Sequence, residues 1–72
     1  MLSPKEHKIL KEIAEKQVIT RVELKKATKE PKSILDTCLK SLLEKKYIAT
    51  LSFSSRCYII TKTGIRALED HE

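Results

Sequence analysis

Hydrophobic residues in the first part of the chain recur at the spacing of an α-helix. Ile9, Leu10 and Ile13 fall on one side of such a helix, and lysines and glutamates fill most of the other positions. The preceding Ser-Pro-Lys-Glu reads as a capping box with proline at the first helical position. The pattern therefore predicts an amphipathic helix over residues 4–16.

A second and a third helix are predicted next, separated by a proline. Thr-Arg-Val-Glu, which begins at Thr20, is another capping box and predicts a short helix over residues 21–27. A β-branched link precedes it, and the pattern leaves open whether this link is a brief strand. Pro31 suits the first turn of a new helix, so the third helix is predicted over residues 31–46. Helical spacing places an apolar stripe on this helix, opposite small polar residues and a lysine: Leu35, Cys38, Leu39 and Leu42.

The pattern changes after the third helix. Residues 47–61 hold two runs rich in β-branched and aromatic residues on either side of a polar Ser54-Ser55 turn, which predicts a β-hairpin. Thr61 then caps a last short helix from Lys62 to about Asp70, with Gly64 in its first turn.

The order of these elements is that of a helix-turn-helix followed by a hairpin. A short second helix, a tight break and a longer third helix with a polar outer face are typical of the helix-turn-helix. A hairpin directly after them makes the motif winged. The expected fold is therefore mainly α with a small β-hairpin wing, α-α-α-β-β-α, in a single winged-helix domain over residues 1–72.

Composition narrows the class of partner. The chain has 72 residues and a net charge of +5, and three of its ten acidic residues lie among the last four positions. The remaining seven acids and all 15 basic residues give residues 1–68 a charge of +8. A small basic domain favours polyanions, nucleic acid first and anionic membrane second. No apolar run approaches the ~18 residues of a membrane span, and the start lacks the apolar core of a signal peptide, so we expect a cytoplasmic protein.

Two segments resemble a known family. Residues 39–48, Leu-Lys-Ser-Leu-Leu-Glu-Lys-Lys-Tyr-Ile, resemble the end of a winged-helix recognition helix, and residues 56–64, Arg-Cys-Tyr-Ile-Ile-Thr-Lys-Thr-Gly, resemble the returning strand of its wing. The chain is similar to small MarR/PadR-type regulators, including minimal ones from archaea and their viruses. The family often has glycine where the third helix ends. Lys46 stands there in this chain, so we expect a different cap.

The resemblance implies a double-stranded DNA-binding protein that regulates transcription. The recognition helix, residues 31–46, would enter the major groove, and the wing, residues 48–61, would reach the backbone or the minor groove. Larger relatives dimerise through long terminal helices, whereas this chain ends soon after the wing. We therefore expect a homodimer with another contact surface, drawn from Ile34, Leu51, Phe53 or Ile59. No small-molecule effector is expected, and a viral or archaeal chain would act in the host cell or nucleoid.

The candidate DNA-binding residues lie on three segments. The family pattern points to the outer face of the third helix, and the wing tip and the flanks of the motif add contacts to the backbone. Asp36 would accept a hydrogen bond from cytosine or lie beside a cation, because a bare carboxylate repels DNA. The full set is Arg21, Lys29, Lys32, Ser33, Asp36, Thr37, Lys40, Ser54, Ser55 and Arg56.

Other polar residues have simpler interpretations. The lysines of the first helix, Lys5, Lys8, Lys11 and Lys16, are expected to be solvated surface. His7 and His71 lack the spacing of metal ligands, and no cofactor or metal is expected. Cys38 should be a buried thiol, while the direction of Cys57 and a bond between the two cysteines stay open. No catalytic motif is present in the sequence, so an enzyme is not expected.

Two other functions stay open. The same fold serves as a protein–protein interaction module in larger assemblies, and the polar recognition face is compatible with that role. Binding of RNA or single-stranded DNA is less favoured, because the sequence has few aromatic residues for base stacking.

Overall fold

Four helices and a three-stranded sheet make up the fold. The structure, a computed structural model, describes residues 2–51 and 54–71, without the side chains of Ser54, Ser55 and His71. The elements follow one another as α1 (Pro4–Lys16), β1 (Val18–Thr20), α2 (Arg21–Thr28), α3 (Lys32–Glu44), β2 (Ile48–Leu51), β3 (Ser54–Ile60) and α4 (Lys62–His71). The winged-helix order expected from the sequence is confirmed, with the short link before α2 forming strand β1.

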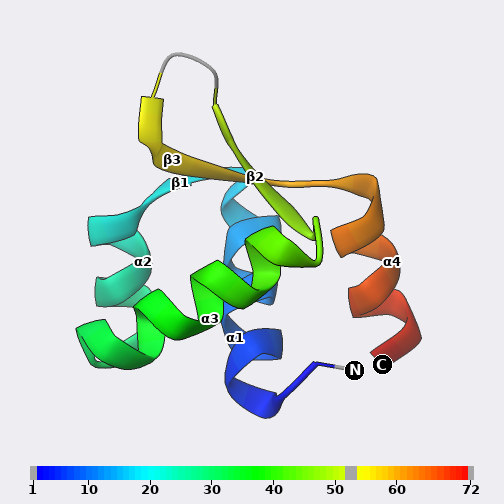
Figure 1. Cartoon of the computed structure of the whole chain (residues 1–72), viewed down its shortest axis with the longest axis horizontal. Helices are drawn as coiled ribbons and strands as arrows, with labels where there is room; N and C mark the ends of the chain where they lie inside the picture. Colours follow the sequence, from blue (N-terminus) through cyan, green and yellow to red (C-terminus); the bar gives the residue numbers. More distant parts are fainter. Residues whose placement is uncertain (1, 52–53, 72) are drawn as a thin grey trace.

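The sheet stands over the helices. Its strand order is β1-β3-β2 with both pairings antiparallel, so β3 lies in the centre. Val18 pairs with Ile59 and Thr20 with Cys57, while Ile48 pairs with Ile60. Figure 1 shows the β2–β3 hairpin, called the wing here, projecting from the helices, with α2 and α4 at opposite sides of the molecule. Helix α1 packs against all three other helices and holds them together.

The core is formed by one stripe from each helix and the inner side of the sheet. Ile9, Leu10 and Ile13 are fully buried, as the spacing on α1 predicts. The four apolar residues predicted for the stripe on α3 are all buried, and Ile19, Ile48 and Tyr58 add the contribution of the sheet. Burial of a Leu or Ile side chain stabilises the fold by roughly 1.5–3 kcal/mol. The buried stripe on α3 therefore fixes which face of that helix points outward.

The starts of α1 and α2 have the predicted capping boxes. The Ser3 hydroxyl accepts from the Glu6 amide, and the Ser3 amide donates to the Glu6 carboxylate, both at 3.2 Å. Thr20 and Glu23 repeat this exchange at 3.2 and 3.1 Å. Each box satisfies two backbone N–H groups that the helix itself leaves unpaired.

The bounds of α3 differ from the expectation of 31–46. Pro31 is the N-cap residue rather than part of the first turn, with extended backbone at ψ 154°, and the helix ends at Glu44. Proline at the N-cap provides no side-chain acceptor, so α3 begins without a side-chain cap. The recognition helix is thus shorter at both ends than predicted.

The expectation of a different cap at the end of α3 is wrong. The Tyr47 amide donates to the Leu42 carbonyl and the Lys46 amide to the Leu43 carbonyl, each at 3.0 Å. This is the Schellman pattern, in which the residue after the C-cap takes a left-handed conformation that usually selects glycine. Lys46 adopts it with φ 64°. The chain therefore keeps the usual geometry with a lysine in the glycine position.

The wing joins α4 through a close approach of backbones at Gly64. Thr61 caps α4, because its hydroxyl accepts from the Gly64 amide at 3.1 Å. The same hydroxyl donates between the Lys46 and Tyr47 carbonyls, at 2.7 and 2.9 Å. A Cβ atom at Gly64 would lie 2.1 Å from the Tyr47 carbonyl oxygen. Glycine is therefore required here by packing, in the first turn of α4 as the sequence predicts.

Candidate nucleic-acid interface

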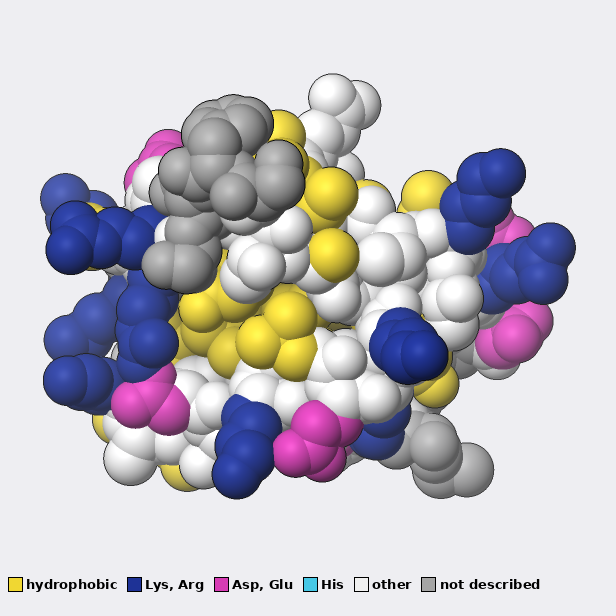
Figure 2. Space-filling view, turned by 45° about the horizontal axis from the view of Figure 1, so that its top comes forward, with side chains coloured by type: hydrophobic (Ala, Val, Ile, Leu, Met, Phe, Trp, Pro, Cys, Tyr) yellow, Lys and Arg dark blue, Asp and Glu magenta, His cyan; other side chains and the backbone are white. Residues whose placement is uncertain are grey.

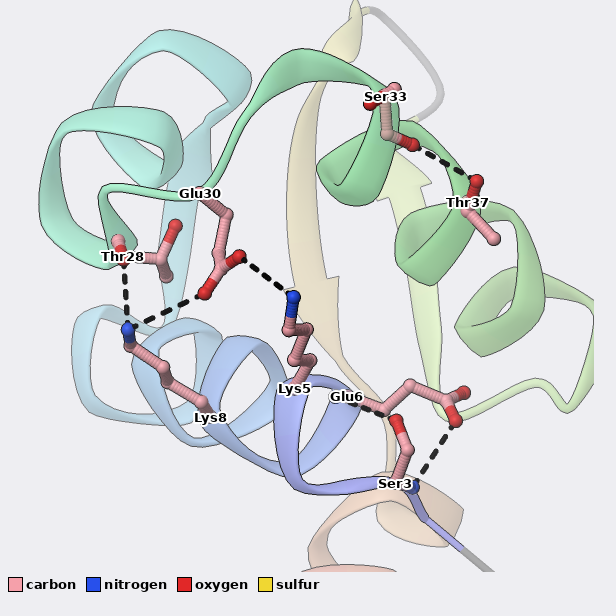
Figure 3. Close-up of polar contacts among 8 residues, drawn as sticks. All are labelled: Ser3, Lys5, Glu6, Lys8, Thr28, Glu30, Ser33 and Thr37. Carbon is pink, nitrogen blue, oxygen red and sulfur yellow. Dashed lines mark hydrogen bonds and ion pairs between the residues drawn. The ribbon is translucent and has the colours of Figure 1, made fainter.

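The outer face of α3 is polar and open to solvent. Lys32, Ser33, Thr37 and Lys40 are all exposed, on the side opposite the buried stripe. The Thr37 hydroxyl donates to the Ser33 carbonyl at 2.9 Å, and Figure 3 shows both residues on the part of α3 turned away from α1. The hydroxyl proton of Thr37 is thus engaged within the helix, which leaves its oxygen as an acceptor only. The structure brings these four candidates together as the sequence predicts.

Asp36 lies on the same face and forms an ion pair with Arg21. Arg21 is the first residue of α2, and its Nη2 atom contacts Oδ1 of Asp36. The two side chains are 39% and 43% exposed. Of the two environments expected for Asp36, the structure shows a neighbouring cation, which comes from the other helix of the helix-turn-helix. The pair connects the start of α2 with the second turn of α3.

A surface depression separates α2 from the wing. It has a volume of about 590 Å³ and is lined by Thr20, Arg21, Val22, Arg56 and Tyr58. Arg21 directly follows Thr20, and Arg56 directly precedes Cys57. Because Thr20 and Cys57 are paired across the two strands, both arginines line this depression. Two arginines and an apolar wall therefore lie between the first helix of the motif and the wing.

Sequence reasoning missed three of these lining residues, and Val22 is the clearest case. Val22 belongs to the short second helix predicted from its capping box, and its side chain is 64% exposed. The signal that could have placed it is the spacing of Leu24 and Thr28, which are the buried residues of α2. Val22 does not share their face.

The wing residues differ in position from the prediction. Ser54 and Ser55 belong to strand β3 rather than to a turn, and Ser54 pairs with Leu51. Residues 52–53, between β2 and β3 in the sequence, lie outside the described residues. Arg56 is on β3 with an exposed side chain, so of the three wing candidates it is the one whose side chain the structure places.

Lys29 occupies the turn of the motif. It ends α2 in a left-handed conformation, φ 58°, with its amide donating to the Lys25 carbonyl at 2.9 Å. Its side chain is exposed, as are those of Lys25 and Lys26. Figure 2 shows Lys and Arg side chains gathered at the left of the face, the side of the molecule where Figure 1 has α2, beside a hydrophobic area at the centre. The exposed lysines at the end of α2 and in the turn therefore provide the basic flank of the motif.

Two lysines of α1 are surface residues, as expected, and also have structural partners. Lys8 donates to the Thr28 carbonyl at 2.9 Å, and both Lys5 and Lys8 lie 3.7 Å from the Glu30 carboxylate. Figure 3 shows the two lysines reaching from α1 to the turn between α2 and α3. These contacts hold the turn of the motif against α1.

A second polar cluster, centred on Glu6 of α1, lies at the C-terminal end of α3. Burial of Glu6 opposes ionisation, but hydrogen bonds from Ser41, Ser3 and Lys45 prevail and lower the pKa of Glu6 to about 2. The Ser41 hydroxyl donates at 2.7 Å and the Lys45 ammonium lies at 3.2 Å. Polar contacts thus connect α1 both to the turn that precedes α3 and to the C-terminal end of α3, in addition to the core.

Cys38 and Cys57 are not joined by a disulfide. Cys38 is buried, as predicted, and burial together with Glu6 and Glu30 raises the pKa of its thiol. Cys57 is half-buried. Among residues 2–51 and 54–71, no group of His, Cys, Asp and Glu side chains has the arrangement of a metal site. In the same part of the chain, no helix is long and apolar enough to cross a membrane.

Comparison with known proteins gives a match in structure. No family model and no characterised protein matches the sequence. The crystal structure of the reduced form of MarR from E. coli superimposes on 96% of this chain with a TM-score of 0.86, at 26% sequence identity. The fold is a MarR-like winged helix. This chain spans about half the length of that MarR chain, 50%. In the MarR-like frame, α2 and α3 are the helix-turn-helix and β2–β3 is the wing.

Proposed function

We propose that this chain binds double-stranded DNA as a transcriptional regulator. The observation that carries the proposal is the MarR-like winged helix over 96% of the chain, with the outer face of its α3 exposed and polar. In this fold class the second helix of the motif enters the major groove, so α3 is the recognition helix of the proposal. The wing then lies against the backbone or in the minor groove.

The contacts with phosphate come from the rim of α3. Arg21, Lys29 and Arg56 surround the recognition helix on α2, the turn and the wing, and their side chains are exposed or half-exposed. Phosphate contacts fix the position of a protein on the duplex and supply most of its sequence-independent affinity. The +8 charge of residues 1–68 supports the same interaction.

The contacts with base edges come from α3 itself. Ser33, Thr37 and Lys40 follow one another along the exposed side of the helix, with Lys32 at its start. Lysine reaches guanine acceptors or phosphate, and hydroxyl groups can donate or accept at either. The Thr37 oxygen, which is left as an acceptor, suits an amino group of cytosine or adenine.

A homodimer is part of the proposal, because one small domain makes few base contacts and a two-fold site doubles them. The apolar residues expected at its surface, Ile34, Leu51 and Ile59, are half-buried, and Phe53 lies outside the described residues. The large hydrophobic side chains that the described part of the chain exposes are Val18, Val22, Leu43 and Ile65. Because α2 and α4 lie at opposite sides of the molecule, the dimer contact is proposed at one of these residues rather than at all four. We further propose that the chain acts in the cytoplasm, without a cofactor, catalysis or a small-molecule effector.

The experiment is a titration of short duplex DNA at two salt concentrations, followed by fluorescence anisotropy. Binding at low salt that weakens steeply at higher salt is the expected result, because each neutralised phosphate releases counterions. Absence of binding to any duplex at low salt would overturn the proposal and favour a protein–protein interaction module.

A further inference from the structure

The outer face of α3 holds a carboxylate where phosphates would come close. Asp36 lies one turn after Lys32 and Ser33 and one turn before Lys40, so it is surrounded by the proposed DNA contacts. The other acid of α3, Glu44, lies at the end of the helix. A negative charge in the middle of a DNA-binding face weakens binding to every sequence unless it gains a specific partner. The position of Asp36 therefore indicates a role in discriminating among DNA sequences.

The two carboxylate oxygens of Asp36 have different environments. Oδ1 contacts Arg21 and has no exposed surface, whereas the side chain as a whole is 43% exposed. The exposed part therefore includes Oδ2. Arg21 has five N–H donors, and the pair with Asp36 leaves others for a phosphate. The ion pair thus holds the carboxylate in one orientation and also places a cation beside it.

An ionised carboxylate only accepts hydrogen bonds, and this restricts the base edges that it tolerates. In the major groove, guanine presents two acceptors, and thymine presents an acceptor and a methyl group. Adenine presents an amino group beside the N7 acceptor, while cytosine presents its N4 amino group alone. Cytosine is therefore the base edge that best suits Oδ2.

We propose that Asp36 is a specificity-determining residue that accepts a hydrogen bond from the N4 amino group of one cytosine in each half-site, while Arg21 holds its other oxygen and binds the adjacent phosphate. This inference rests on the proposed DNA-binding function. It adds to that function the base that is read and the residue that reads it.

The test selects binding sites from a randomised duplex pool with the wild-type chain and two variants. Asp36→Asn removes the charge and adds an amide donor, and Glu44→Gln removes the same charge at the end of the same helix. The wild type and Glu44→Gln are expected to prefer a C·G pair at one position on the order of tenfold or more over the other pairs. Asp36→Asn is expected to lose that preference and to bind non-specific duplex more tightly.

The outcomes separate the two proposals. If the wild type binds no duplex at low salt, the proposed function fails. If it binds but its selected site has no fixed C·G pair, or Asp36→Asn keeps the preference of the wild type, only the inference about Asp36 is overturned. A DNA-side test needs no variant: changing the selected cytosine to thymine, which replaces the amino group with a carbonyl, must weaken wild-type binding by a similar factor.

Discussion

Glu6 in the first turn of α1 accepts a hydrogen bond of 2.7 Å from Ser41 near the end of α3. The two residues are 35 positions apart, and the same carboxylate completes the capping box of α1 with Ser3. One ionised group therefore stabilises the start of a helix and the position of the proposed recognition helix. This dual role makes Glu6 a suitable residue for testing the structure.

Acidification should remove the contribution of Glu6 to stability. The pKa of Glu6 is lowered from 4.5 to about 2 in the folded chain, against the opposing effect of burial, by hydrogen bonds from Ser41, Ser3 and Lys45. The unfolded state therefore binds the proton first, and the stabilisation is complete above pH 4.5 and is lost as the pH falls towards about 2. Thermal unfolding of the wild type and Glu6→Gln should differ most above that range and converge near its lower end.

Glu15→Gln is the control for this series, because Glu15 is an exposed residue of the same helix. Its melting temperature should follow the wild type throughout. A difference between the wild type and Glu6→Gln that does not change with pH would contradict the assigned role of the carboxylate.

Replacing Lys46 with glycine should stabilise the chain. Left-handed backbone costs an L-residue roughly 1–2 kcal/mol, and the greater freedom of glycine in the unfolded chain offsets part of the gain. We expect a net increase of about 0.5–1 kcal/mol in the free energy of unfolding, measured by urea denaturation. The matched variant is Lys45→Gly, where φ is −78° and glycine gives no relief, so stability should fall.

Replacing Gly64 with alanine should destabilise the chain. The added methyl group would overlap the Tyr47 carbonyl oxygen at 2.1 Å and the Ile60 side chain at 2.9 Å. Forced overlap in a packed region costs roughly 1–3 kcal/mol, because backbone or rotamers must shift. Thr63→Ala, at the exposed neighbouring position, should keep near-wild-type stability. Equal melting curves for Gly64→Ala and the wild type would mean that α4 does not meet the wing at this point.

Arg21 and Arg56, which line the depression, should both contact phosphates of the DNA. Arg21→Ala and Arg56→Ala are each expected to weaken binding to all duplexes and to lower the salt slope of the affinity by about one phosphate. Arg21→Ala carries an additional cost, since it also leaves the Asp36 carboxylate without its cation. In a double-mutant cycle, Asp36→Asn should therefore reduce the loss caused by Arg21→Ala but not the loss caused by Arg56→Ala.

Local patterns in the sequence predict most of the fold. The bounds of α1 agree with residues 4–16 because a capping box and a regular apolar spacing both act within the helix. The stripe from Leu35 to Leu42 is buried for the same reason. The long-range features were not predictable in this way. The pairing of β1 with β3 and the contact of Lys8 with Thr28 depend on how distant segments meet.

In the candidate site, too, features set within one helix were predictable, whereas contacts between distant segments were not. The exposed positions of Lys32, Ser33, Thr37 and Lys40 follow from the helical period alone. The pairing of Asp36 with Arg21 joins two helices and depends on their crossing, so the sequence left two environments open for Asp36. At Lys46 the residue type led to a wrong expectation of another cap. Backbone hydrogen bonds there outweigh the cost of a left-handed lysine.

The most direct test of the proposed DNA interface compares two charge reversals in one binding assay. Lys40→Glu changes the charge on the exposed face of α3, and Lys11→Glu makes the same change on an exposed position of α1. Affinity for a short duplex is measured by anisotropy at low salt, with thermal unfolding as the check on folding. We predict that Lys40→Glu weakens binding at least tenfold more than Lys11→Glu, on the order of the 1–3 kcal/mol of a groove contact. Equal effects of the two reversals on a duplex-binding chain would contradict the placement of α3 in the groove.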